Sequence, residues 1–544
     1  MNCLLKRVLA AGAAVLLCGA AAVLPASAEE TADSNSFTDN VLTYEKIDGG
    51  VRVTAADSGV NSVSVKSMID GYPILEIGDN VFSGCSALTS VTIASGVKSI
   101  GENAFAGCVA LETVSLPDTL ETIHDGAFGY CVSLKSLDLP DSLRTVGSYS
   151  FAYCVSLEGL KFPAGVRSVE PYTFYYDSKL KSVTLPDTLE SIDSMSFVSC
   201  DALESLTIPA SVTEIGDMAL LSCTGLKTVT VDPANSSFCT EDDILLLTKS
   251  GEKLLLYAAG SPADSCAVPE GVKQLAPYCF SGSANLKTIT LPASVEEIGD
   301  GAFADCTALE QFDYPKQLTK IGSSVFADCA ALKAFTIPDS VTEIGDFAFF
   351  SCKSLTEISL PASVVSIGKE AFCDCTAMNR VDVPATVQKI GDYAFGFCLK
   401  ESDGDNGDTA ALQEGFVLGG APNSAAKDYA AASGVKFDPN GIDTQLLVKI
   451  ALIAAIVLLA AAIALMLVRS VRAAKAEKAA APAEEEIPDP NYVSILGDEA
   501  SGDPYERSYG FQIEEDDDAE DDDAEDETGD DMDDVIPQED DPEA

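Results

Sequence analysis

The sequence predicts a β-rich α/β solenoid of about 13 coils of 23 residues, followed by one transmembrane helix and a disordered tail. Three observations predict this fold class. A 23-residue unit recurs with almost no slip of register, a strand-like segment in each unit ends at a proline, and a phenylalanine returns at a fixed place. Self-similarity at a period of about 20 to 50 residues is the mark of a solenoid.

The phenylalanine column shows how regular the repeat is. One copy of the unit, residues 111–133, reads LETVSLPDTLETIHDGAFGYCVS. With Leu220 as the one substitute, the column holds Phe82, Phe105, Phe128, Phe151, Phe174, Phe197, Phe280, Phe303, Phe326, Phe349, Phe372 and Phe395. A single unit cannot bury its apolar residues, so stacked units must share one continuous core.

Each unit has three parts. A segment rich in Thr, Val and Ile, such as the one that contains Val114, predicts a strand of about three to five residues. A proline such as Pro117 ends it, because proline cannot donate to a strand ladder. An apolar pair and a turn follow, and the final Ala-Phe segment with its cysteine predicts one helical or 3₁₀ turn.

The repeat pattern, L-x-x-[VI]-x-[LI]-P-x-x-[VL]-x-x-I-G-x-x-A-F-x-x-C, resembles the BspA-like class of bacterial surface leucine-rich repeats. The resemblance covers residues 69–398, and the solenoid is therefore expected to be a leucine-rich-repeat array. It implies a surface-exposed binding array, often adhesive, rather than a catalyst.

One interruption breaks the period. From Leu220 to Phe280 the spacing is 60 residues, so one coil carries 37 extra residues. Residues 242–260, DDILLLTKSGEKLLLYAAG, predict a β-hairpin within an insertion at about 232–268. Two interpretations stay open: a spacer packed on the side of the solenoid, or a protruding element that shapes a binding surface.

The chain has 17 cysteines, and eleven of them share one repeat column: Cys85, Cys108, Cys131, Cys154, Cys200, Cys223, Cys306, Cys329, Cys352, Cys375 and Cys398. A cysteine beside the phenylalanine in each coil is best explained as a small buried apolar residue. Cys239 and Cys266 flank the interruption and are the best candidates for a disulfide. No CxxC pair is present, so no metal site is predicted.

The candidate ligand-binding residues are tyrosines that cluster in three adjacent coils. Two residues after the repeat phenylalanine the chain has Tyr130, Tyr153 and Tyr176, and neighbouring columns hold Tyr149, Tyr172 and Tyr175. Stacked tyrosines make an amphipathic patch of the kind enriched at protein interfaces and able to stack on sugars. The alternative is a packed ladder that only stiffens the array.

Composition excludes several function classes. The net charge of −53 makes the chain a poor nucleic-acid binder, since phosphate binding needs clustered Lys and Arg. With one histidine and no nucleophile elbow, P-loop or GxGxxG motif, we predict no enzyme and no cofactor. The expected partner is an extracellular protein or glycan of unknown identity.

The flanking segments predict the topology. Residues 1–28 are typical of a secretory signal peptide, 29–68 of an N-terminal β cap, 69–400 of the solenoid, and 401–441 of a C-terminal cap and spacer. Residues 446–468 are long and apolar enough to cross a membrane, and basic residues from Arg469 onward predict a cytoplasmic C-terminal side.

The tail, 469–544, is expected to be disordered because its acidic run has too little apolar surface to fold. It is either a solvated brush or a docking segment for a basic cytoplasmic partner. We therefore predict a single-pass cell-membrane protein with extracellular repeats. Its function is either that of an adhesin or surface interaction protein, or that of a receptor or scaffold that couples binding to the tail.

Overall fold

The computed structural model describes residues 36–39, 41–400 and 409–439, together with Ile456, Leu459, Ala460, Ala462, Ile463 and Met466. The predicted signal peptide and acidic tail lie outside the described residues. So does the predicted membrane span, 446–468, apart from the six isolated positions, which are helical. Within the described residues, no helix has the length and apolar character needed to cross a membrane.

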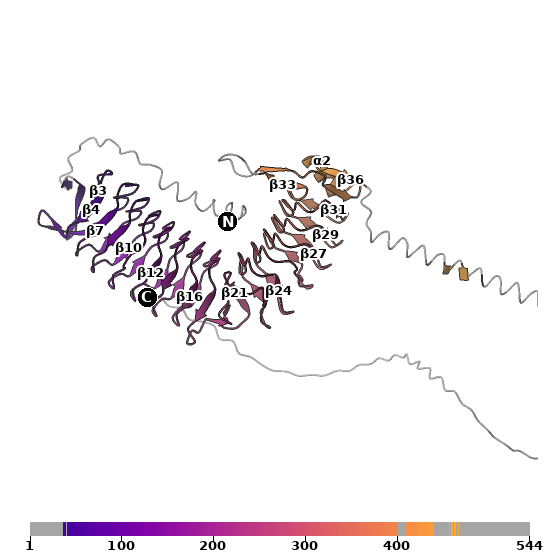
Figure 1. The fold of residues 1–544 in the computed structure, drawn as a ribbon, viewed down its shortest axis with the longest axis horizontal. Coiled ribbons are helices and arrows are strands. Elements are labelled where there is room, and N and C mark those ends of the chain that lie inside the picture. Colours follow the sequence, from indigo (N-terminus) through magenta and orange to yellow (C-terminus); the bar gives the residue numbers. More distant parts are fainter. Residues whose placement is uncertain are drawn as a thin grey trace, which may run out of the picture. The chain divides into compact units, whose positions relative to one another are not determined.

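The described chain is a leucine-rich-repeat β-solenoid of about 17 turns, whose strands stack coil on coil (Figure 1). The first strand of a coil belongs to one face. These strands are β4 (Ser62–Val65), β7 (Ser90–Ile93), β9 (Thr113–Ser115), β12 (Gly159–Lys161), β14 (Ser182–Thr184), β16 (Ser205–Ile208), β18 (Thr228–Val231), β22 (Ser265–Ala267), β24 (Thr288–Thr290), β27 (Ala334–Thr336), β29 (Glu357–Ser359) and β31 (Arg380–Val383).

The second strand of a coil is usually two residues long and follows the proline turn. These strands are β6 (Tyr72–Ile77), β8 (Ser99–Ile100), β10 (Thr122–Ile123), β11 (Thr145–Val146), β13 (Ser168–Val169), β15 (Ser191–Ile192), β17 (Glu214–Ile215), β23 (Gln274–Leu275), β25 (Glu297–Ile298), β26 (Lys320–Ile321), β28 (Glu343–Ile344), β30 (Ser366–Ile367) and β32 (Lys389–Ile390). Pairing within both faces of the repeat is parallel and usually offset by one unit, as when Leu206 lies opposite Val229.

The third side of each coil differs from its prediction. The Ala-Phe segment forms no helical turn, because the residues two before and two after the phenylalanine lie in the left-handed region. Around Phe151 these are Tyr149, with a φ of 57°, and Tyr153, with a φ of 62°. The phenylalanine N–H instead donates to the next coil, as from Phe105 to the Ala127 carbonyl at 2.8 Å. The third side is therefore also hydrogen-bonded from coil to coil.

Two coils lack the first strand that the sequence predicts for every unit. Residues 134–140 form no strand, and residues 309–315 contribute only an isolated bridge between Thr288 and Gln311. Aromatic residues lie beside both places. Phe312 is buried in the second, and Phe162, which meets Phe174 edge-on at 5.9 Å, borders the first. Phe335 stands in the same column as Phe312 and nevertheless belongs to the paired strand β27, so an aromatic side chain does not by itself break the ladder.

The interruption is itself a coil of the solenoid. β19 (Phe238–Glu241), β20 (Leu245–Thr248) and β21 (Lys253–Tyr257) form an antiparallel meander, and β21 then pairs in parallel with β23. Tyr257 stacks on Phe280 at 5.2 Å, so it takes the place of the missing phenylalanine. The predicted coil count is therefore too low by one coil here. Because most of its leucines are buried, the hairpin is part of the wall and does not protrude.

Both ends of the array are closed by strands. At the N-terminus β1 (Ser36–Thr38), β2 (Leu42–Ile47) and β3 (Gly50–Ala56) pair antiparallel, and β3 pairs in parallel with β6, against which β5 (Met68–Ile69) also lies. At the C-terminus the elements are β33 (Phe397–Lys400), β34 (Thr409–Leu412), β35 (Val417–Gly420), α2 (Ala425–Ser433) and β36 (Lys436–Asp438).

Tyr429 on α2 shows how the C-terminal cap satisfies the last coil. Its hydroxyl accepts a hydrogen bond from the Phe395 N–H at 2.9 Å and donates one to the Phe395 carbonyl at 2.8 Å. In the coils before it, the phenylalanine N–H finds its partner in the following coil. One side chain thus replaces the backbone that a further coil would supply.

The core consists of stacked columns. Phenylalanine rings follow one another at centroid distances such as 4.9 Å between Phe82 and Phe105. Beside them, column thiols donate to the phenylalanine carbonyl of the previous coil, as from Cys131 to Phe105 at 3.3 Å. Burial raises the pKa of Cys131 well above its ordinary value, so the thiol stays protonated and can donate. Apart from the half-exposed Cys398, the cysteine column is thus a ladder of buried free thiols.

Candidate functional site

The predicted tyrosines form two stacked ladders on the third side of the solenoid. Tyr130, Tyr153 and Tyr176 make the first ladder, with ring centroids 4.4 Å and 5.2 Å apart and nearly parallel planes. Tyr149 and Tyr172 make the second ladder, at 4.5 Å. These five residues, all half-buried, are called the tyrosine ladders below. Every one of them has a positive φ, a conformation in which tyrosine is uncommon.

Tyr175 does not belong to the exposed surface predicted for it. It is only 2% exposed and lies between the two ladders, where its ring meets Tyr153 and Tyr172 edge-on at 5.6 Å each. Its position one residue after the phenylalanine points inward, since Ala152 and Val198 at the same place in neighbouring coils are also buried. Tyr175 therefore supports the ladders from below and is unavailable to a ligand.

The ladders cover a small apolar core of their own. Ala152, Tyr175, Val198 and Leu221 form a buried cluster separate from the main core, and partly buried side chains close over it. The covering residues are four of the ladder tyrosines together with two methionines and one further tyrosine: Tyr149, Tyr153, Tyr172, Tyr176, Met195, Met218 and Tyr278. The two methionines continue the Tyr149 column at the same 23-residue spacing, a signal that could have placed them at this surface. The apolar surface is consequently longer than the tyrosines alone indicate.

The hydroxyls of Tyr130, Tyr149, Tyr153 and Tyr176 remain protonated at physiological pH. Burial raises the pKa of Tyr149 to about 12, and the neighbouring Tyr172 adds to the rise. Burial likewise raises the pKa of Tyr176 to about 12, and it raises the pKa of Tyr130 and Tyr153. These four residues therefore present neutral hydroxyl groups that can both donate and accept hydrogen bonds.

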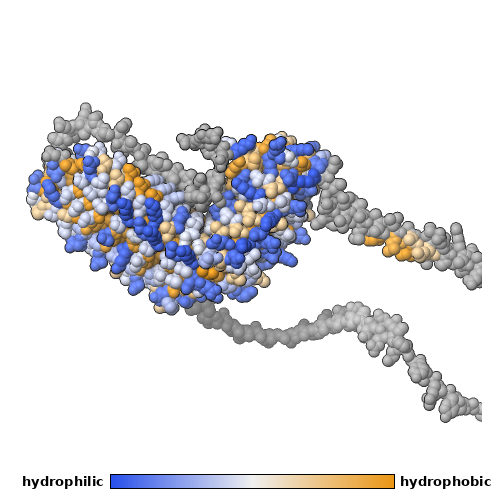
Figure 2. Space-filling view, viewed as in Figure 1, coloured by the Kyte–Doolittle hydropathy of each residue, from blue (hydrophilic) through white to orange (hydrophobic). Residues whose placement is uncertain are grey.

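Stacking restricts what the ladders can offer. A ring inside a ladder has its faces covered by the rings before and after it, so it presents only an edge and a hydroxyl. An edge-and-hydroxyl surface can hydrogen-bond to the polar groups of a protein or a glycan. In the view of Figure 2, apolar residues lie in bands among hydrophilic ones rather than in one continuous patch.

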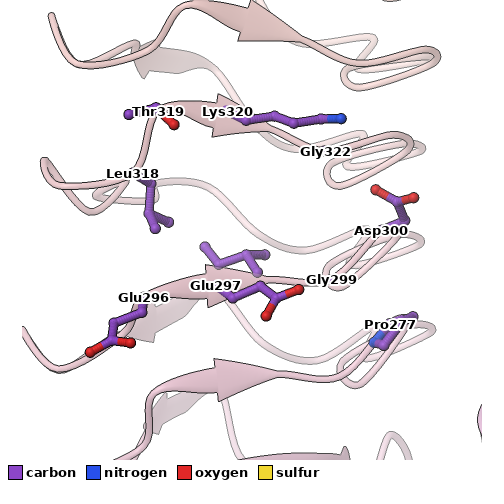
Figure 3. A pocket seen from close by; sticks show the side chains of 10 residues that line it. Pro277, Glu296, Glu297, Gly299, Asp300, Leu318, Thr319, Lys320 and Gly322 are labelled. Carbon is purple, nitrogen blue, oxygen red and sulfur yellow. The ribbon is translucent and has the colours of Figure 1, made fainter.

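Two clefts of about 370 Å³ lie where strand ladders are interrupted. The first separates β25 from β26, and Figure 3 shows Glu297 and Lys320 on the successive rungs that border it. Both side chains already have partners: Gln274 donates to Glu297 at 3.1 Å, and Lys320 lies 3.2 Å from Glu343. The second cleft lies beside the strandless segment 134–140 and is bordered by Asp138 and Lys161.

Cys239 and Cys266, the predicted disulfide candidates, are free thiols in the structure. They stand in different sheets, because β19 pairs with β20 whereas β22 pairs with β24. Cys239 donates to the Thr248 carbonyl at 3.5 Å, and Cys266 is buried in the core. Both thiols thus have separate places in the packing.

Asp177 replaces the cysteine of the repeat column with an acidic residue. It lies directly after Tyr176, is fully buried, and neither carboxylate oxygen has a hydrogen-bond partner. Burial raises its pKa well above the ordinary value of 3.8, and the Cys154 backbone offsets only part of that rise. The coil that contributes most tyrosines is therefore also the one with an unsatisfied acid in its core.

Comparison with known proteins identifies the repeat. The model of the BspA type leucine rich repeat region matches six copies, over residues 61–178, 144–241 and 262–402, which is more than half of the chain. The comparison with curated proteins gives no match.

Two solved structures that are similar to this chain belong to bacterial proteins. A leucine rich cell surface protein from Faecalibacterium prausnitzii is 32% identical, with 66% of this chain and 94% of that chain covered and a TM-score of 0.60. A leucine-rich repeat protein from Bacteroides ovatus is 26% identical, with 74% and 99% covered and a TM-score of 0.48. The match to the family model over most of the repeats makes this chain a member of the BspA-type leucine-rich repeat family.

Proposed function

We propose that the chain is a non-catalytic cell-surface binding protein, an adhesin or surface interaction protein, whose tyrosine ladders contact the ligand. One observation carries the proposal. In an array whose columns hardly vary, five partly exposed tyrosines gather on one side of a few adjacent coils. Tyrosine is enriched in protein-binding surfaces because it offers a large contact area and a hydroxyl at low entropic cost.

Its relatives support the location. The similar protein from Faecalibacterium prausnitzii is described as a cell surface protein. We extend that location to this chain through its own segments: a cleaved signal peptide at 1–28, a membrane span at 446–468 and a cytoplasmic tail from Arg469. The repeats would then be extracellular and displayed by a single membrane helix.

The absence of catalysis is part of the proposal. Family membership favours it, and in the first cleft Glu297 already accepts a hydrogen bond from Gln274 while Lys320 pairs with Glu343 of the next coil. An acid–base pair would need two groups with free access to a substrate. The cleft offers neither a histidine nor a cysteine in its lining.

The test uses cells that display the full chain. Tyr130→Ser, Tyr153→Ser and Tyr176→Ser are introduced together, and attachment of the displaying cells to immobilised host proteins and glycans is measured. The control changes Asp305→Ser and Asp328→Ser, which occupy the same column in distant coils. Attachment should be lost in the tyrosine variant and kept in the control. Unchanged attachment by a folded tyrosine variant would contradict the proposal.

A second function, receptor or assembly scaffold, is favoured by the composition of the tail. From Glu484 to Ala544 the chain has 28 acidic residues and a single arginine, Arg507, a density suited to docking a basic partner. Deleting 484–544 separates the two functions. An adhesin keeps its attachment and its cellular effect without the tail, whereas a receptor keeps attachment and loses the effect.

A further inference from the structure

The first tyrosine ladder ends at Tyr130, and that end is open. Tyr153 stacks on one face of the Tyr130 ring, and among the described residues no ring stacks on its other face. The preceding coils have Gly107 and Gly84 at the same place in the repeat. Tyr130 is thus the one member of this ladder whose column neighbour on the N-terminal side has no side chain.

The space in front of Tyr130 is free. A Cβ built on Gly84 would meet nothing within 4 Å, and one built on Gly107 would meet only the Gly84 backbone, at 3.7 Å. In the neighbouring column, two residues before the phenylalanine, a tyrosine does fill the corresponding space: a Cβ on Gly301 would collide with the Tyr278 ring of the previous coil. Tyr130 instead stacks on Tyr153 of the following coil. In the two coils that precede Tyr130, this column therefore has glycine and no side chain that could cover the open face of the Tyr130 ring.

The backbone at Gly84 and Gly107, called the ledge below, is bordered by polar groups and one apolar side chain. Ser83 and Ser86 flank Gly84 and are exposed, and the turn around Gly107 carries Val109, which is 42% exposed. The turns are held rigidly, since Ser86 donates its N–H to the Gly84 carbonyl at 2.7 Å and Val109 donates to Gly107 at 2.8 Å. The site thus combines the flat face of the Tyr130 ring, the glycine backbone of the ledge and the exposed hydroxyls of Ser83 and Ser86.

We propose that the open face of Tyr130, above the ledge of Gly84 and Gly107, binds a neutral hexopyranose ring of a glycan. The inference rests on the proposed function and names the ligand class for the same surface. A pyranose has one apolar C–H face for the ring and a rim of hydroxyls for the serines. An open ring face above two glycines does not enclose an aromatic or prolyl side chain of a peptide enough to desolvate it. Ser83, Ser86 and Val109 carry no positive charge that could pair with an acidic sugar.

The test measures saturation transfer from the full-length protein to the methyl glycosides of glucose, galactose, mannose and N-acetylglucosamine. The blocking variant is Gly107→Asn, because asparagine tolerates a positive φ and Asn103 already adopts one in this coil. Gly107→Asp is the second blocking variant, since Asp305 has the same column and a φ of 59°. Gly282→Asn, in the same column with a φ of 80°, is the matched control.

The expected result is binding of at least one glycoside through its ring C–H protons. Both blocking variants should weaken it by about tenfold or more, the effect of losing about 1.4 kcal/mol, and Gly282→Asn should leave it unchanged. Gly107→Tyr should keep binding, because it lengthens the ladder and opens a new ring face above Gly84.

Three outcomes overturn the inference: no glycoside binds, blocking variants and control behave alike, or a peptide with aromatic or prolyl residues competes for the face. The proposed function is tested separately. If no glycoside binds but the tyrosine variant loses cell attachment, the hexopyranose site is wrong and the tyrosine surface stands. If attachment also survives, both are wrong.

Discussion

Asp177→Cys restores the thiol ladder at the one place where an acid interrupts it. Cys154 and Cys200, in the coils on either side, donate to the carbonyls of Phe128 and Phe174 at 3.2 Å each. Asp177 stands where a thiol would reach the Phe151 carbonyl, and its two oxygens have no partner. We expect Asp177→Cys to raise the free energy of unfolding at neutral pH.

The magnitude follows from burial and proton linkage. A buried polar group without a partner costs about 1–3 kcal/mol. Each unit by which the pKa rises in the folded state costs 1.36 kcal/mol of stability once the pH exceeds it, so between pKa 3.8 and pH 7 the linkage is at most about 4 kcal/mol. A gain of about 2–4 kcal/mol at pH 7 is therefore expected.

The sign of the pH dependence is fixed by the raised pKa. The folded protein keeps the proton that the unfolded chain loses near 3.8, so the wild type loses stability as the pH rises from there through the folded pKa. The advantage of Asp177→Cys should consequently grow between pH 5 and pH 8. Urea unfolding followed by circular dichroism measures it.

A matched control is available in the same column. Ser283 also replaces the cysteine and is buried without a hydrogen-bond partner, but it does not titrate. Ser283→Cys should change stability by the same amount at every pH. The reasoning is refuted if Asp177→Cys is destabilising at pH 7, or if its effect is as independent of pH as that of Ser283→Cys.

Other predictions concern the cap, the thiols and the surface charges. Tyr429→Phe removes both hydrogen bonds to the Phe395 backbone and should cost about 1–3 kcal/mol, with faster hydrogen exchange at the Phe395 amide; unchanged exchange there would be inconsistent with the cap. All fifteen cysteines after residue 28 should react with a thiol reagent in denaturant, and in the native protein Cys239 and Cys398, the half-exposed ones, should react first; a lower count would reveal disulfides. Lys227→Glu, opposite Glu204 at 3.0 Å, should cost less than about 1 kcal/mol and lose that effect in high salt, whereas a larger effect that salt leaves unchanged would contradict a surface ion pair.

The fold was predictable because it follows from the 23-residue period of the sequence. A 23-residue spacing of Phe, Cys and Pro determines which residues stack, and the parallel register of Thr122 with Thr145 follows directly. What failed were features that depend on local packing. The Ala-Phe turn resembles a helix start in composition, but two left-handed residues per coil prevent a helix. Tyr257 was missed as a column member because 37 residues, not 23, separate it from Leu220.

The site was predictable in its position and not in its geometry. Spacing placed Tyr130, Tyr153 and Tyr176 in one column, and they do stack. Spacing could not reveal that Tyr175 points inward, because side-chain direction in a turn depends on its φ and ψ angles. Nor could it show that stacking hides the ring faces, which leaves the open end at Tyr130 as the distinctive feature.

A hydrogen-exchange footprint of the bound ligand on the full chain would show whether the tyrosine ladders form the binding surface. Once a ligand is known, its addition should slow exchange at the backbone amides around Tyr130, Tyr153 and Tyr176. Exchange in the insertion at 242–260 and beside the cleft between β25 and β26 should stay the same. Protection confined to the insertion or that cleft, with none at the tyrosine ladders, would contradict the account.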